Sequence, residues 1–413
     1  MEYNVILILY NYSMNCNIQK LYGIAAKPKR LIIGLMSGTS LDGLDIALCS
    51  LEGNGINTKL ELLNFETIAY AHDFKTEIRT VFSKKEIDLE KLCLLHPWIA
   101  LQHAAMINTC LQKWNIKNDE VDLIASHGQT IYHAPKSLHG QQAFGNATLQ
   151  IGDGDHLAVA TGIITISDFR QKNIAAGGEG APLAVYGDYL IFGKAGEDRI
   201  LLNIGGIANF TYLPGEDENE KILCTDVGPG NTLMDAFMQK NFTGQPYDKD
   251  AAVAKAGIIN DHLLLALKEN DFFTQDFPKT TGPELFNLEY LQKAKQKSNT
   301  EFLSVEDIMA TLNKFSSDMI VLAVNYCIRN KTEIKIFTSG GGIHNPLLMQ
   351  HLQQQLTNCS FYSIAETGIN PDAKEAVLFA LLANECVSGA ASTFINISID
   401  IPAVTLGKIS FPA

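Results

Sequence analysis

The sequence has 413 residues, with 45 acidic and 32 basic side chains and a formal net charge of -13. Because hydrophobic cores stop growing at about 250–300 residues, a chain of this length is expected to form two domains. The negative charge repels phosphate backbones and anionic headgroups, so we expect no general binding to nucleic acid or to membranes. A nucleotide can still bind where backbone N–H groups and a metal ion offset its charge.

The eight cysteines are scattered, with no C-x-x-C pair and no clustering with histidine. This pattern is typical of thiols in a reducing compartment and unlike a disulfide framework or a zinc site. We therefore predict a cytoplasmic protein with no metal ion held in a side-chain cluster. The apolar run Val5 to Leu9 is too short to span a bilayer and lacks a basic flank. Residues 1–29 are interpreted as an extension ahead of the first domain.

The first predicted elements are a strand, a tight turn and a returning strand. Arg30 to Gly34 is an apolar run typical of a buried strand, a turn rich in Gly, Ser and Thr follows, and residues 44–51 form the second strand. Further along, the pattern predicts a helix over 89–114 and strands over 121–125 and 162–167, the first of these ending at Ser126-His127-Gly128-Gln129-Thr130.

The same arrangement begins again at Arg199, where strands over 200–204 and 208–213 flank the turn Gly205-Gly206. Two strand-rich units that alternate with helices indicate an α/β fold with two domains of similar core. We assign residues 30–168 to domain I, completed by about 395–413, and residues 169–394 to domain II. The remaining predicted elements are strands over 221–224 and 334–338 and helices over 232–240 and 346–356.

Three glycine-rich turns are predicted to bind a nucleotide between the two domains. Small residues let several N–H groups and hydroxyls reach one anion, although the first turn alone could equally be an ordinary hairpin. The third turn lies before a helix, whose dipole favours phosphate. Asp42 and Asp45 either hold magnesium through water or orient their turn. The turns are Gly38-Thr39-Ser40-Leu41-Asp42-Gly43-Leu44-Asp45, Gly205-Gly206 and Gly340-Gly341-Gly342.

Asp226 is the candidate catalytic residue. It directly follows a predicted buried strand and precedes a predicted helix. A carboxylate at the end of a strand can accept a proton from a hydroxyl or a water beside a γ-phosphate. The alternative is an Asx-type cap, but the rigid and open Gly228-Pro229-Gly230 segment favours the catalytic role.

Three further residues are candidates for substrate binding. Arg170 can pair with a carboxylate or a phosphate through two hydrogen bonds, or it can form a salt bridge between domains. His127 follows a predicted strand and is expected to face a cleft, although a lone histidine is more often a structural hydrogen-bonding group. Glu375 lies near a helix start, where a carboxylate also serves as a cap.

Together these segments resemble the anhydro-N-acetylmuramic acid kinase family from about Arg30 onward. The most specific motifs are M-S-G-T-S-L-D-G and D-V-G-P-G-N, which begin at Met36 and Asp226. The segments S-H-G-Q-T, D-F-R, A-A-G-G-E-G-A-P-L, L-N-I-G-G-I-A-N, S-G-G-G-I-H-N and N-P-D-A-K-E-A also match, in the same order. The resemblance implies two actin-like (ribonuclease H-like) domains that close over a cleft, with ATP and Mg²⁺ as co-substrate and cofactor.

The resemblance also implies a reaction in which water opens a 1,6-anhydro bridge while O6 receives the γ-phosphoryl group of ATP. The products are N-acetylmuramic acid 6-phosphate and ADP, in the recycling of cell-wall murein. Asp226 matches the base, Gly38 to Asp45 the phosphate turn, and Arg170 and Glu375 two sugar contacts, Arg170 through the lactyl carboxylate. Thr39 and His127 are further candidates for sugar contact.

Three positions depart from the usual family pattern, namely Asn173, Glu179 and Pro283. They leave open a simpler anhydrosugar such as levoglucosan as the substrate. A plain hexose kinase, in which Asp226 deprotonates a free hydroxyl, is a second alternative. A nucleotide-gated module of the same superfamily is a third, although we expect no room for a peptide-binding part after Glu375. Whether the chain forms a homodimer is left open.

Overall fold

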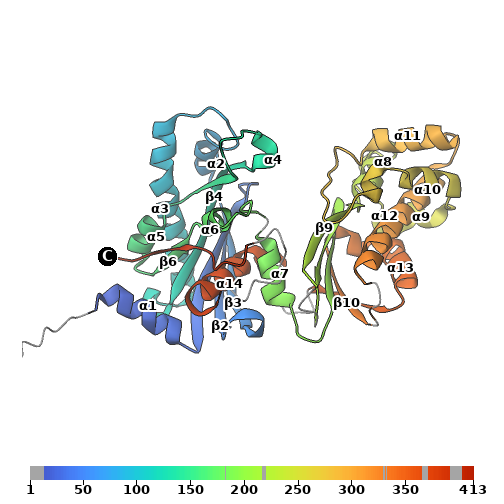
Figure 1. Cartoon of the computed structure of the whole chain (residues 1–413). Helices are drawn as coiled ribbons and strands as arrows, with labels where there is room; N and C mark the ends of the chain where they lie inside the picture. The colour runs from blue at the N-terminus through green and yellow to red at the C-terminus, as the bar shows by residue number, and fades with distance from the viewer. Residues whose placement is uncertain are drawn as a thin grey trace, which may run out of the picture. The chain divides into compact units, whose positions relative to one another are not determined.

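The computed structural model of the chain describes residues 14–181, 183–215, 220–328, 331, 333–364, 371–390 and 402–413. They form two compact units, each with its own sheet (Figure 1). Unit 1 comprises residues 1–182, 375–393 and 404–413, and unit 2 comprises residues 183–374 and 394–403. We predicted the second domain over residues 169–394, whereas residues 169–182 and the helix that follows Lys374 group with unit 1.

Unit 1 is built on a mixed sheet with the strand order β12-β6-β4-β1-β2-β3, to which β5 adds by pairing with β4. Strand β1 is antiparallel to β2 and parallel to β4, and β4 is parallel to β6. The elements are α1 (Cys16–Ala26), β1 (Lys29–Ser37), β2 (Gly43–Glu52), β3 (Lys59–Ala69), α2 (His72–Arg79), α3 (Leu89–Trp114), β4 (Leu123–Ala134), α4 (Lys136–His139), β5 (Ala147–Ile151), α5 (Gly154–Thr161), β6 (Thr165–Ser167), α6 (Phe169–Ala175), α14 (Lys374–Ser388) and β12 (Lys408–Ser410).

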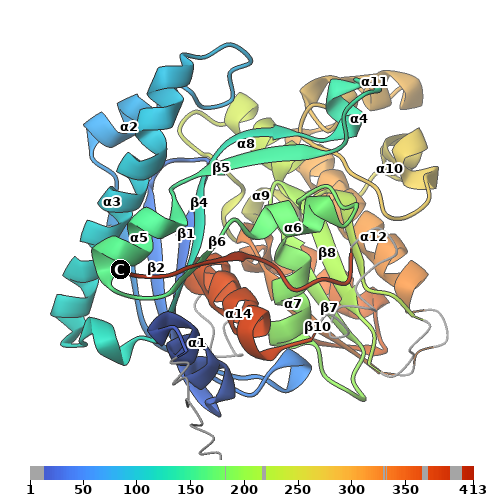
Figure 2. The same ribbon diagram turned by 60° about the vertical axis from the view of Figure 1, so that its left-hand side comes forward.

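The central strand of unit 1 alternates between the two faces of its sheet. Ile33 and Leu35 belong to the core cluster that includes residues of α3. Gly34 points to the opposite face, where α14 lies (Figure 2). A Cβ atom on Gly34 would lie 1.9 Å from the carbonyl oxygen of Ala376, so only glycine lets this helix pack on the strand.

Unit 2 has a mixed sheet with the order β11-β10-β7-β8-β9. Alternate residues of β7, such as Ile200 and Leu202, join the main core together with α8 and α12. Its elements are α7 (Ala184–Phe192), β7 (Arg199–Ile204), β8 (Ile207–Leu213), β9 (Leu223–Pro229), α8 (Thr232–Asn241), α9 (Ala252–Ala256), α10 (Asp261–Lys268), α11 (Leu288–Ser298), α12 (Val305–Cys327), β10 (Ile334–Ser339), α13 (Pro346–Gln355) and β11 (Cys359–Ser363).

The two sheets have the same topology. In each one, three consecutive strands form an antiparallel meander, and two later strands add in parallel beside the first strand of that meander. The order β3-β2-β1-β4-β6 in unit 1 thus corresponds to β9-β8-β7-β10-β11 in unit 2. This repeat confirms the predicted α/β class with two domains of similar core. In the part of the chain that the structure describes, no helix is both long enough and apolar enough to cross a bilayer.

Most predicted elements are present, but three strands run further than predicted. Strand β1 continues through Gly34 to Ser37 because β2 pairs with it along its whole length. Strand β4 continues through the polar S-H-G-Q-T segment to Ala134, where β5 pairs with it. Strand β9 includes Asp226, which pairs with Asn209 of β8. The predictions that His127 and Asp226 follow their strands were therefore wrong.

Candidate active site

The first glycine turn of unit 1 is short and connects β1 to β2. Its backbone is closed by a hydrogen bond from the N–H of Leu41 to the carbonyl oxygen of Gly38, at 3.3 Å. Thr39, Ser40 and Asp42 expose their side chains, whereas Leu41 is buried and anchors the turn in the core. The polar groups of the turn are thus available to a ligand.

The predicted turn segment Gly38 to Asp45 does not form one structural element. Residues Gly43, Leu44 and Asp45 belong to β2, and a Cβ atom on Gly43 would lie 2.5 Å from the carbonyl oxygen of Ile68. Gly43 therefore permits close strand packing. Asp45 accepts a hydrogen bond from the Thr67 hydroxyl at 2.6 Å, which occupies one of its carboxylate oxygens.

Arg170 lies at the start of α6 and is held from two sides. Its Nε donates to Nε2 of His127 at 3.1 Å, and its Nη1 donates to the carbonyl oxygen of Gly180 at 2.7 Å. Burial lowers the pKa of Arg170, and the nearby carboxylate of Glu375 opposes that shift. Glu375 itself is exposed in the first turn of α14. The structure thus brings three predicted substrate-binding residues of unit 1 together.

His127 is 3% exposed, and its ring stacks at a tilt on Phe379 of α14. Burial, and next the charge of Arg170, lower its pKa to about 3, so the imidazole is neutral at physiological pH. A neutral Nε2 that accepts from Arg170 requires the proton on Nδ1. His127 nevertheless lines a cavity of about 360 Å³ in unit 1, in agreement with the expectation that it faces a cleft, and its Nε2 accepts from the guanidinium of Arg170.

The unusual residue Asn173 has a structural role in the same cluster. Its side-chain oxygen accepts from the N–H of Gly180 at 2.8 Å, and the carbonyl oxygen of Gly180 in turn receives Arg170. Asn173 therefore fixes the loop that orients the guanidinium. Glu179 and Pro283, the other two departures, are exposed.

In unit 2, three glycine segments meet at one edge of the sheet. Strands β7, β9 and β10 run in the same direction, so their carboxyl ends lie together. The N–H groups of Gly230 and Asn231 donate to the carbonyl oxygens of Gly206 and Gly205, at 2.8 and 2.9 Å. A Cβ atom on Gly340 would lie 2.6 Å from Oδ1 of Asn203. Ligands of open α/β sheets bind at this edge.

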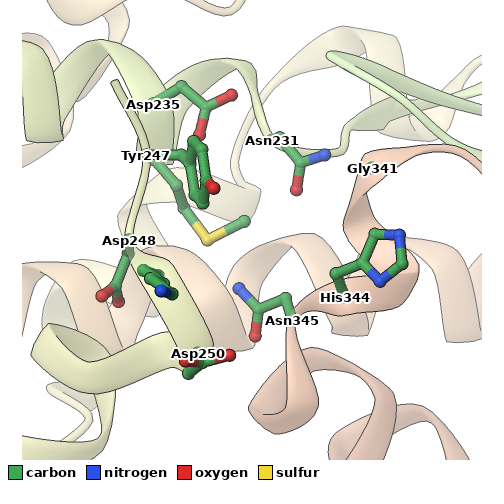
Figure 3. Close-up of a pocket in the computed structure, with 10 residues that line it drawn as sticks. Asn231, Asp235, Tyr247, Asp248, Asp250, Gly341, His344 and Asn345 are labelled. Atoms are coloured by element: carbon green, nitrogen blue, oxygen red, sulfur yellow. The ribbon is translucent and has the colours of Figure 1, made fainter. Parts of the chain in front are cut away.

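A cavity of about 330 Å³ adjoins these glycine segments (Figure 3). Figure 3 shows Asp235 and Tyr247 on one side of it and His344 and Asn345 on the other. Burial raises the pKa of Asp235 to about 6. The predicted glycine Gly341 lines the cavity, whereas the sequence analysis missed the polar residues around it, which are Asn231, Asp235, Tyr247, Asp248, Lys249, Asp250, His344 and Asn345.

Asp226 is held by the segment that runs beside β9. Its Oδ2 accepts from the N–H of Thr281 at 2.9 Å, and its own N–H donates to the carbonyl oxygen of Lys279 at 3.0 Å. Among the described residues, no hydrogen bond reaches its Oδ1. Burial raises the pKa of Asp226, and the hydrogen bond from Thr281 partly opposes this. The carboxylate is thus oriented through one oxygen, and the other can accept a proton.

A repeated mixed sheet with glycine turns at the carboxyl ends of its strands is an arrangement suited to a nucleotide-binding α/β protein. The chain belongs to the anhydro-N-acetylmuramic acid kinase family, whose model matches residues 30–412. It is 56% identical over 400 residues to the anhydro-N-acetylmuramic acid kinase of Pseudoalteromonas atlantica, covering 97% of this chain and 100% of the relative. Identity is 55% to that of Pseudoalteromonas translucida (96% and 100% covered) and 35% to that of Caldanaerobacter subterraneus (95% and 100%).

Proposed function

We propose that this chain uses ATP to convert 1,6-anhydro-N-acetylmuramic acid to N-acetylmuramic acid 6-phosphate and ADP. The observation that carries the proposal is the identity of 56%, over 97% of the chain, to a relative named for this kinase activity. The oriented carboxylate of Asp226 supports it, because the reaction needs a base. The three departures from the family pattern, Asn173, Glu179 and Pro283, leave Asp226, the proposed base, in place.

The nucleotide is assigned to unit 2. The cavity lined by Asp235 and Tyr247 lies in the size range of small-ligand sites, and Tyr247 offers an aromatic face to a base. The glycine segments around Gly205, Gly230 and Gly341 present backbone groups without side-chain bulk, as phosphates require. The exposed turn at Gly38 to Asp42 in unit 1 also has N–H and hydroxyl groups that suit a phosphate.

Asp226 acts as the general base in the proposed mechanism. The carboxylate takes a proton from water, and the water oxygen bonds to the anomeric carbon while the bond from that carbon to O6 breaks. O6 then bonds to the γ-phosphorus, and the bond from the γ-phosphorus to the bridging oxygen breaks, which releases ADP. The raised pKa of Asp226 makes it a better proton acceptor than an exposed aspartate.

The sugar is assigned to the cluster around Arg170. With Nε and Nη1 bonded within unit 1, the guanidinium keeps Nη2 to donate to the lactyl carboxylate. Glu375 is the candidate acceptor for a sugar hydroxyl. Thr39, exposed on the turn from Gly38 to Asp42, is a further candidate for sugar contact. His127 acts through Arg170.

Magnesium would neutralise charge on the phosphates. Among the described residues, no group of three or more His, Cys, Asp or Glu side chains is arranged to hold a metal ion. Mg²⁺ is commonly bound by one or two carboxylates together with waters and substrate phosphates. Asp42, which is exposed, and Asp45, which lies three residues further on, are the carboxylates of this segment that would hold it.

The test is ADP release from magnesium-ATP with 1,6-anhydro-N-acetylmuramic acid, compared with levoglucosan and with N-acetylmuramic acid. We expect a product heavier by one phosphate and one water from the first sugar only. Turnover of levoglucosan alone, or of N-acetylmuramic acid alone, would show that this sugar is the substrate and that the proposed one is wrong. ADP release without sugar would instead support a nucleotide-gated module.

Asp226→Asn tests the base in the same assay. The amide keeps the shape of the side chain but cannot accept the proton, so turnover should be abolished while ATP still binds. Near-normal turnover in this variant would rule out Asp226 as the base.

A further inference from the structure

A network of buried, hydrogen-bonded polar side chains lies behind the first glycine turn of unit 1. Nε2 of His103, on α3, is 2.9 Å from the hydroxyl oxygen of Tyr70, which follows β3. The Tyr70 hydroxyl donates to Oγ of Ser37 at 2.7 Å, and Ser37 donates to Oε1 of Gln129 at 2.5 Å. All four side chains are at most 4% exposed, so water does not compete for these hydrogen bonds.

The donors and acceptors of this network fix which atom donates in each of its hydrogen bonds. Because the protons of Tyr70 and Ser37 both point toward Gln129, the remaining hydrogen bond must run from Nε2–H of His103 to the Tyr70 oxygen. Burial lowers the pKa of His103 to about 4 and raises the pKa of Tyr70. Both groups are therefore neutral at physiological pH, and a buried neutral network with every bond made is rigid.

This network holds the turn at both of its ends. Ser37 directly precedes Gly38, and Nε2 of Gln129 donates to the carbonyl oxygen of Gly38 at 3.4 Å. At the other end, the N–H of Tyr70 donates to the carbonyl oxygen of Asp42 at 3.1 Å. Tyr70 thus contacts the start of the turn through its side chain and the end through its backbone.

We propose that Tyr70 and His103 are positioning residues for ATP, acting through the turn from Gly38 to Asp42. The inference rests on the proposed role of that turn in phosphate binding. Donors that are already fixed where phosphate charge lies need no reorganisation when the nucleotide binds or reacts. The network supplies this order from behind the turn, without touching the ligand.

Tyr70→Phe in the full chain tests the proposal, with Tyr186→Phe as the matched control. Tyr186 is buried in unit 2, and its hydroxyl donates to the carbonyl oxygen of Pro402 at 3.0 Å. Tyr70→Phe removes two hydrogen bonds of the hydroxyl, one to Ser37 and one from His103, whereas Tyr186→Phe removes the bond to Pro402. Both melting temperatures should therefore fall, and that of Tyr70→Phe should fall further. We expect KM for ATP to rise about tenfold in Tyr70→Phe only, because the loss of buried hydrogen bonds in this network loosens the turn from Gly38 to Asp42. KM for the sugar should stay unchanged in both variants.

His103→Leu and His103→Gln provide a second comparison. Leucine leaves the Tyr70 oxygen without its donor, whereas the side-chain amide of glutamine can donate to it. We expect His103→Leu to raise KM for ATP and His103→Gln to restore most of the loss. Equal defects in the two variants at equal stability would contradict the assigned hydrogen bond.

Gly38→Ala separates this inference from the proposed function. A Cβ atom there would meet no atom closer than 3.6 Å, so the fold tolerates it, but the methyl group would stand among the phosphate donors. If Gly38→Ala impairs ATP use while Tyr70→Phe matches Tyr186→Phe, the positioning role is wrong and the turn's function stands. If neither variant changes ATP kinetics, the turn does not bind phosphate and both ideas fall.

Discussion

Gly340 and Gly341 are neighbours in one glycine run, yet alanine should lower the stability of the chain at Gly340 and leave it almost unchanged at Gly341. Gly340 has φ +84°, a left-handed conformation, and its Cβ would lie 2.6 Å from Oδ1 of Asn203 and 2.7 Å from the carbonyl oxygen of Ile204. At Gly341 the nearest atom to such a Cβ is Nδ2 of Asn231, at 3.8 Å. The backbone around Gly340 must move to admit a methyl group, whereas Gly341 has room.

The expected loss for Gly340→Ala has two parts. A non-glycine residue in the left-handed region costs about 1–2 kcal/mol. Relief of two short contacts in a packed region adds about 1–3 kcal/mol. We therefore expect Gly340→Ala to lower the free energy of unfolding by about 2–5 kcal/mol in total. Gly341→Ala should change it by less than about 0.5 kcal/mol, as at a position with no special contacts.

Urea unfolding, followed by circular dichroism, measures both variants against the unmodified chain. ADP release measures their function. Because Gly341 lines the cavity of unit 2, its alanine variant should raise KM for ATP while leaving the urea midpoint unchanged. Equal shifts of the midpoint in the two variants would refute the steric argument. An unchanged KM in Gly341→Ala would refute the assignment of the nucleotide to this cavity.

Two more variants test charge and hydrogen bonding. The folded-state pKa of Asp235, about 6, lies above its ordinary value of 3.8, so its ionised form is penalised and stability falls as pH rises from about 4 to 6. Asp235→Asn should stabilise the chain at pH 7.5, by about 1 kcal/mol after allowance for solvent screening, and not at pH 4, which urea midpoints at both pH values would show. His127→Leu removes the acceptor for Arg170 and should raise KM for the sugar. His127→Gln keeps an acceptor, so its KM for the sugar should stay close to that of the unmodified chain. Equal KM values in these two variants would contradict the role of His127.

The sequence predicted the apolar strands well because burial on both faces leaves continuous apolar runs. It failed where polar residues continue a strand. Ser126 to Thr130 was taken as a strand end, but the hydrogen-bonding partners of His127 and Gln129 come from distant parts of the chain. Only the fold shows that those buried polar groups have hydrogen-bond partners inside the sheet.

The candidate site was predicted in part for a similar reason. Asp226, Arg170 and the glycine turns were proposed from their places at turns and strand ends and from motifs that resemble a kinase family, and their roles stay predictions. The cavity residues Tyr247 and His344 lie in loops without a recognisable pattern. One signal was available, since Asn231 directly precedes the predicted helix over 232–240 and Asp235 follows four residues later, which brings the two side chains to the same side of the helix start.

The packing of α14 against Gly34 has a consequence for synthesis on the ribosome. Strand β1 is made early, but the helix that covers it begins only at Lys374. The residues of unit 2 from 183 to 374 are all translated before that helix. Domains commonly fold in order of synthesis, from the N-terminus onward. The core of unit 1 between its sheet and α3 can form early, because its residues all lie between 33 and 163. The opposite face of the sheet, around Gly34, stays uncovered until α14 is made, so chaperones have a long interval in which they can bind β1.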